Sequence, residues 1–127
     1  MSCPRRDRGS GESGQATVEL ALLTPLLVLL LLAVAQVGLV ARDQILVVHA
    51  ARAGARAAAV DPRVEVAVSG ALEATSLPPD ETEVHVVFEG PVVTVTVAHR
   101  SSTTVPLVGA LVDDVLVRAT VTFRVER

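Results

Sequence analysis

The run of hydrophobic residues from Leu20 to Ala41 dominates the pattern along the chain. It holds 22 residues without a single charged side chain. As a helix rising ~1.5 Å per residue it spans ~33 Å, enough to cross a hydrocarbon core of ~30 Å. Pro25 lies inside the run, and membrane helices tolerate proline, often with a kink. The pattern therefore predicts a transmembrane helix over residues 15–41, preceded by a polar leader over residues 1–14.

Residues 42–60 are rich in alanine, leucine and arginine, which favour helix. We therefore expect one continuous helix from about residue 16 to residue 60. Two faces of this extension stand out. One is polar and is interpreted as a solvated or headgroup-facing surface: Arg42, His49, Arg52 and Arg56. The other is a stripe of small residues that lets another backbone approach closely: Ala50, Gly54 and Ala58.

A second, amphipathic helix is predicted over residues 62–76. Asp61 is a favourable N-cap and Pro62 suits the first helical position. Apolar residues then recur with helical spacing until Pro78. Gly70 weakens this helix.

Strict alternation of apolar and polar residues follows and predicts strands joined by a turn at Gly90–Pro91. An antiparallel register with this turn puts nearly all large apolar side chains on one face. Burial of that face specifies the register. The predicted pairs are Val84 with Val97, Val86 with Val95, and Phe88 with Val93.

A third alternating strand is predicted over residues 117–126. Residues 101–114 before it form a loop, with one helical turn expected over residues 106–111. Three strands with one apolar face need a cover, and helix 62–76 is the expected one. The fold class is thus α+β: a long transmembrane helix extending outward, a short amphipathic helix and a three-stranded antiparallel sheet. Residues 61–127 are predicted to form a small α+β domain outside the membrane.

Charge and composition exclude several functions. Residues 1–60 carry six arginines and four acidic residues, whereas residues 61–127 carry five arginines and ten acidic residues. An acidic domain with two aromatic residues does not suit nucleic-acid binding, which needs a basic face or stacking rings. Cys3 is the single cysteine and lies in the leader, so no intramolecular disulfide forms.

No constellation of catalytic or metal-binding residues is found. The predicted register puts His85 and His99 on opposite faces of the sheet, so they cannot share a zinc ion, and the His/Cys spacing matches no metal motif. No nucleophile motif, phosphate loop or dinucleotide fingerprint is present. We therefore expect neither catalytic residues nor a cofactor.

The boundary of the apolar run is the sharpest signal. Gly14 is followed five residues later by Glu19, at the start of the apolar run and downstream of a basic leader. This spacing resembles the processing site of type IV prepilins. Residues 15–25 (QATVELALLTP) and 42–57 (RDQILVVHAARAGARA) are similar to the TadE-like pseudopilins of tight-adherence (Flp) pilus systems in bacteria. Leu20 departs from the aromatic residue that many pilins of this system carry after the glutamate.

The resemblance implies a non-enzymatic pseudopilin in the cytoplasmic membrane. A prepilin peptidase would cut between Gly14 and Gln15. Glu19 would become mature position five and attract the free amine of a neighbouring pilin-like subunit. The implied partners are the lipid bilayer, the prepilin peptidase, other pilin-like subunits and pilus assembly proteins.

Two alternatives remain from the residues alone. The span resembles an uncleaved signal anchor that carries an extracytoplasmic binding domain. It also resembles a secretory signal, with a hydrophobic region over residues 20–32 and cleavage after Ala35. Arginine counts tie on the two sides of the span, so the cytoplasmic placement of the N-terminus follows only from the prepilin interpretation.

Overall fold

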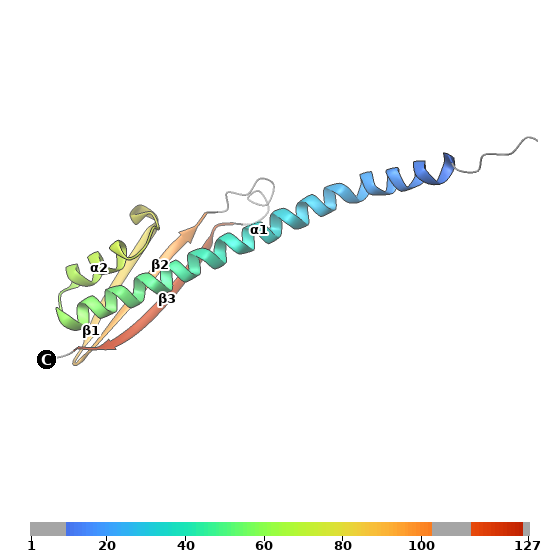
Figure 1. Ribbon diagram of the computed structural model, residues 1–127. Coiled ribbons are helices and arrows are strands. Elements are labelled where there is room, and N and C mark those ends of the chain that lie inside the picture. Colours follow the sequence, from blue (N-terminus) through green and yellow to red (C-terminus); the bar gives the residue numbers. More distant parts are fainter. Residues whose placement is uncertain (1–9, 103–112, 126–127) are drawn as a thin grey trace, which may run out of the picture.

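The computed structural model describes residues 10–102 and 113–125. A very long helix carries a small sheet and a short helix at one end, so the molecule is elongated (Figure 1). In chain order the helices are α1 (Ser10–Val60), α2 (Val64–Glu73) and a 3₁₀ turn, η1 (Pro79–Glu81). The strands are β1 (Thr82–Glu89), β2 (Val92–Ser101) and β3 (Val115–Arg124). The α+β class predicted from the sequence is confirmed.

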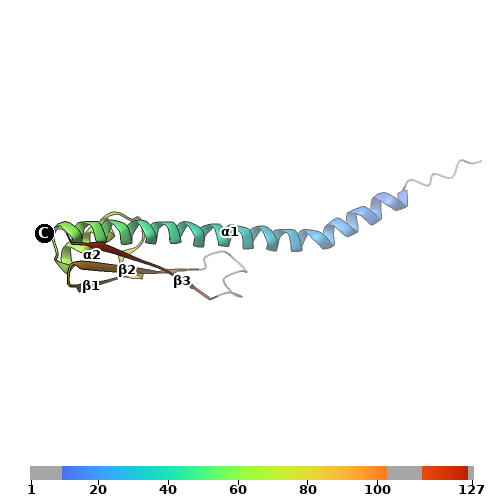
Figure 2. The same cartoon turned by 90° about the horizontal axis from the view of Figure 1, so that it is seen from below.

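The helix α1 runs without a break through both the apolar run and its extension. Its 51 residues correspond to ~77 Å of helix. Residues 10–14, assigned to the leader from the sequence, already form its first turn. Pro25 lies inside α1, and Figure 2 shows the blue N-terminal third of the helix bending away from the straight remainder.

The sheet is antiparallel with the strand order β1-β2-β3. The three predicted pairs of β1 and β2 are all present, and Gly90 takes the positive φ of 60° that their turn needs. In the second ladder Val93 pairs with Phe123 and Val97 with Ala119. The helical turn predicted over residues 106–111 lies outside the described residues.

The cover of the sheet differs from the prediction. The C-terminal half of α1 packs against β2 and β3, and α2 covers only the side near β1. Val47 and Ala51 of α1 and Val95 of β2 are fully buried where these layers meet. The N-terminal half of α1 is thus the candidate membrane span, and its C-terminal half is the main helix packed against the sheet. Local periodicity does not reveal this double role.

The start of α2 also differs from the prediction. Asp61 does not cap it: the N-cap is Arg63, in extended conformation and without a side-chain capping bond. The Asp61 N–H donates to Ala57 O and so ends α1, while the Asp61 carboxylate accepts from Arg63 Nε at 2.8 Å. The carboxylate is therefore held by a guanidinium two residues later, and Pro62 stays in the connection between the helices.

Candidate membrane and assembly segment

The N-terminal half of α1 exposes a large apolar surface. It is the one helix of the described chain that is long and apolar enough to cross a membrane, and its most apolar stretch is not buried by any other part of the molecule. Exposed leucines follow one another around the helix between Leu20 and Leu31. A buried core helix would hide these side chains, so the structure indicates single-pass membrane anchoring.

The predicted processing and assembly residues lie at the free end of this helix. Gly14, Gln15 and Glu19 are all exposed. A Cβ added at Gly14 would meet no atom within 4 Å. Among the described residues, no hydrogen bond or ion pair engages the Glu19 carboxylate. An ionised carboxylate is costly in lipid, so its charge has to be paired or neutralised before it enters the bilayer.

The small-residue stripe of α1 is occupied inside the chain. Ala50 and Ala58 are fully buried, and Gly54 faces α2. A Cβ at Gly54 would lie 2.7 Å from the Ala67 carbonyl oxygen, and one at Gly70 would lie 2.9 Å from the Ala57 Cβ. The backbone that approaches this stripe is therefore that of α2, so the stripe is not free for the helix of another chain.

The polar face of the extension points away from this core. All four of its members are exposed: Arg42, His49, Arg52 and Arg56. A shallow hollow lined by His49, Arg52 and Arg56 separates α1 from Ala74 after α2. Their exposure agrees with the predicted solvated or headgroup-facing surface. Among the described residues, the only arginine in an ion pair is Arg63.

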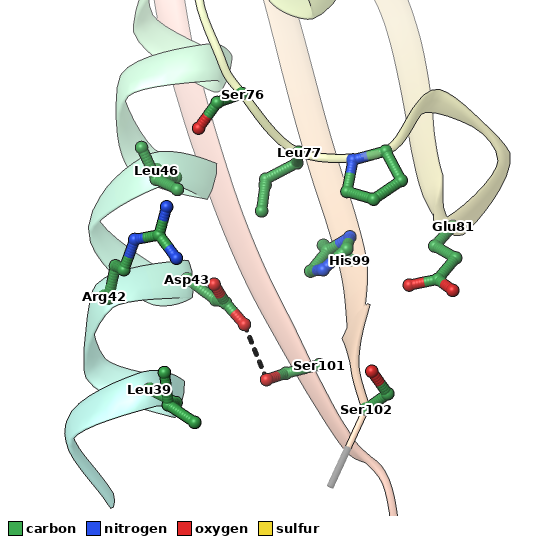
Figure 3. A pocket seen from close by; sticks show the side chains of 11 residues that line it. Leu39, Arg42, Asp43, Leu46, Ser76, Leu77, Glu81, His99, Ser101 and Ser102 are labelled. Carbon is green, nitrogen blue, oxygen red and sulfur yellow. Dashed lines mark hydrogen bonds between the residues drawn. The ribbon is translucent and has the colours of Figure 1, made fainter. Parts of the chain in front are cut away.

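A polar cluster joins α1 to the end of β2 just beyond the apolar run (Figure 3). Ser101, almost fully buried, donates to the Asp43 carboxylate at 2.6 Å. The nearby cavity has a volume of about 200 Å³. Because the Ser101 hydroxyl donates its hydrogen bond to a carboxylate rather than to a histidine, the pair links helix and sheet and is not a nucleophile with its base.

His99 lies on the same side of β2 and is buried as well. Thr82 Oγ1 donates to the Pro78 carbonyl at 2.8 Å, so its contact of 3.0 Å with His99 Nδ1 requires Nδ1 to be the donor. His85 lies exposed on the opposite face, as the register predicted. No group of His, Cys, Asp or Glu side chains within the described ranges has the arrangement of a metal site.

Sequence reasoning missed Gln36. It lies within the apolar run, yet only 6% of it is exposed, and neither polar atom of its side chain has a hydrogen-bond partner. It borders an apolar groove of about 670 Å³ between α1 and the start of β3. The presence of a glutamine in a charge-free run is the sequence signal that could have identified Gln36. The contact of Asp43 with Ser101 has no such signal, because 58 positions separate the two residues.

Comparison with known proteins finds a similarity over the apolar run and its helical extension. The family model for TadE-like proteins matches residues 14–56. The match begins at Gly14 and ends within the part of α1 that packs against the domain, so it confirms the resemblance over this segment. The match covers 43 of the 127 residues, so the similarity to TadE-like proteins concerns this part of the chain. No curated protein and no solved structure matches the chain.

Proposed function

We propose that the protein is a minor pilin-like, non-enzymatic component of tight-adherence pilus assembly or secretion. The observation that carries this proposal is the family match over residues 14–56, which begins at the glycine five residues before Glu19. The exposed apolar half of α1 supports it, because such a surface must be covered by lipid or by similar helices. The protein is anchored by this helix in the cytoplasmic membrane, with residues 61–127 on the extracytoplasmic side.

The first step of the proposed function is hydrolysis of the peptide bond between Gly14 and Gln15 by a prepilin peptidase. The bond lies in the first turns of α1, before the apolar run. The helix has to open locally for a peptidase to reach it, and glycine lowers the cost of opening because it is a poor helix former. Cleavage removes the basic leader, with Arg5, Arg6 and Arg8, and creates a free amine on Gln15.

The second step is docking of subunits through Glu19. The amine of Gln15 in a neighbouring chain is a cation at nearly the same depth as the Glu19 carboxylate. Pairing of the two offsets the cost of placing either charge beside lipid. Because Glu19 has no partner among the described residues, it is available for this contact.

Determination of the N-terminus of the membrane-bound protein tests the processing step. We expect the mature chain to begin at Gln15, and Gly14→Leu to leave the leader attached. Gly11→Leu, which changes a glycine outside the processing site, is the matched control. A mature chain that begins at Gln36 would instead identify a secreted protein, and an intact leader in the wild-type chain would identify a signal-anchored protein with a binding domain.

A variant series at Glu19 tests the docking step. Glu19→Ala and Glu19→Gln should insert into the membrane normally but lose co-purification with other pilin-like subunits, while Glu19→Asp should retain part of it. Glu12→Gln, in the leader, is the control for loss of one carboxylate. Wild-type association of Glu19→Gln would remove the proposed role of this residue.

A further inference from the structure

The two outer edges of the sheet are unpaired and chemically different. Within the described residues, β1 and β3 each pair only with β2. An unpaired edge presents a row of free N–H and C=O groups, which makes it a template for another strand. Both edges also leave apolar side chains incompletely buried: Phe88 and Val86 on β1, and Phe123 and Val121 on β3.

Charge distinguishes these edges on the outer face of the sheet, away from α1. Glu83 and Glu89 lie on β1, whereas Arg118 and Arg124 lie on β3. Within the described residues, the one ion pair of Glu83 is with His85 of its own strand, at 3.7 Å between exposed groups, which is a weak interaction in water. Each edge therefore repels a copy of itself and attracts the other edge.

We propose that a second copy of the chain docks through these edges, with β1 of one copy beside β3 of the other. Both strands are antiparallel to β2, so β1 and β3 run in the same direction. A copy placed alongside in the same orientation thus forms a parallel ladder. This keeps both α1 helices pointing the same way, as two copies in one membrane require.

The existing register predicts which side chains meet on the outer face. Glu83 and Arg118 both align with Ala98, and Glu89 and Arg124 both align with Val92. A copy shifted sideways without stagger therefore puts Glu83 level with Arg118 and Glu89 level with Arg124. Both acid–base pairs are made at once.

The inner face matches as well. Phe88 and Phe123 both align with Val93, and Val86 and Val121 both align with Val95. At the junction, the Phe123 ring of one copy therefore lies next to the Phe88 ring of the other, a favourable aromatic contact. Phe123, 36% exposed in the single chain, becomes covered, so the apolar core continues from one copy into the next.

One contact limits the length of the new ladder. Gln44 Nε2 donates to the Arg118 carbonyl at 3.1 Å and occupies that point of the β3 edge. Backbone pairing is therefore expected from Ala119 to Arg124, and Arg118 contributes through its side chain.

Sheet twist limits the assembly to a pair. Neighbouring strands rotate by about 20–25°, so three strand positions turn the second copy by about 60–75°. Transmembrane helices tolerate tilts up to about 40°. Two copies therefore share one bilayer by tilting in opposite senses, whereas a third copy in the same row does not fit.

Disulfide cross-linking of the full-length protein in membranes, without other pilus proteins, tests the pairing. His85 and Thr120 are exposed and both align with Thr96. Within one chain they are two strand spacings apart, about 9–10 Å, too far for a disulfide. In a Cys3→Ser background, chains with His85→Cys and chains with Thr120→Cys carry different tags and are mixed.

We expect a cross-linked dimer of the two differently tagged chains in the mixture and none with either variant alone. A dimer formed by either variant alone, or no dimer in the mixture, would overturn the proposal. Chains that carry both cysteines should yield dimers in the bilayer, and a ladder of larger products would overturn the limit to a pair. Because no other pilus protein is present, the result is independent of the role of Glu19.

Charge reversal tests the recognition. Glu83→Arg with Glu89→Arg on the His85→Cys chain should abolish the cross-link, and Arg118→Glu with Arg124→Glu on the other chain should restore it. Restoration also shows that both variants fold. The matched control reverses Arg52 and Arg56, which are exposed on α1, and should leave the cross-link unchanged. A cross-link that survives reversal of one edge would exclude recognition by these charges.

Discussion

Gly54 and Gly70 set the distance between the two helices of the domain. Each faces the other helix so closely that a Cβ would lie within 3 Å of one of its atoms. The core that results consists mainly of alanine and valine, including fully buried Ala50, Ala67 and Ala71. Small residues thus replace large rings as the source of tight packing, which suits a chain with only two phenylalanines and no Trp or Tyr.

Gly54→Ala should therefore destabilise the domain, although alanine is the better helix former. The gain in helix propensity is about 1 kcal/mol. Overpacking against the Ala67 carbonyl costs about 1–3 kcal/mol, so we expect a net loss of about 1 kcal/mol. Thermal unfolding followed by circular dichroism measures it. Gly38→Ala, where a Cβ meets nothing within 4 Å, is the control and should show no loss. Equal stability of the two variants would contradict the close contact.

The Asp61–Arg63 pair predicts a weak dependence of stability on acid. The hydrogen bond from Arg63 holds the pKa of the Asp61 carboxyl below its ordinary value of 3.8. A lowered pKa in the folded state adds stability above the unfolded pKa, and this stability is lost as the pH falls through the folded pKa. Asp61→Asn should thus be slightly less stable near neutral pH and equal to wild type in strong acid. A carboxyl resonance of Asp61 that titrates at or above 3.8 would refute the pairing.

At the scale of elements, the alternation of apolar residues was enough to predict the sheet register, because a slip by one position would put Val84, Val86 and Phe88 on the wrong face. The prediction that helix 62–76 covers the sheet was wrong, because periodicity describes the faces of a helix but not which sheet it packs against. The prediction that Asp61 caps α2 was wrong because the Asp61 carboxylate accepts hydrogen bonds from the Arg63 guanidinium instead. Long-range contacts such as Asp43 with Ser101 have no local signature at all.

The double role of α1 makes the effect of a valine substitution depend on its place along the helix. Val47 is fully buried against the sheet, whereas Val37 is 69% exposed. Val47→Ala removes two buried methyl groups and leaves a cavity, which should lower the free energy of unfolding by about 2 kcal/mol. Val37→Ala makes the same chemical change on an exposed surface and should cost far less. Similar losses at both positions, measured in detergent by thermal unfolding, would contradict the packing of the sheet on α1.

For the whole molecule, the unbroken helix fixes the direction in which the domain faces relative to the membrane segment. No loop separates Glu19 from the packed half of α1, and Asp43 and Gln44 hold the sheet to the same helix. A rotation of the helix at Leu30 therefore rotates the domain with respect to Glu19. Assembly contacts made both in the membrane and by the domain require these two faces to keep their relative angle.

Insertions after Leu30 distinguish the effect of the angle between Glu19 and the domain from the effect of the helix length. One added leucine rotates the domain by about 100° and lengthens the helix by ~1.5 Å, whereas four rotate it by about 40° and lengthen it by ~6 Å. Neither touches the core, so both variants should insert and fold as wild type. If the angle governs assembly, one leucine should impair co-purification with pilin-like partners more than four do, although it changes the length less. A defect that grows with the number of added residues would instead show that the depth of Glu19 governs assembly, and full association of both variants would show that the domain acts independently of the membrane helix.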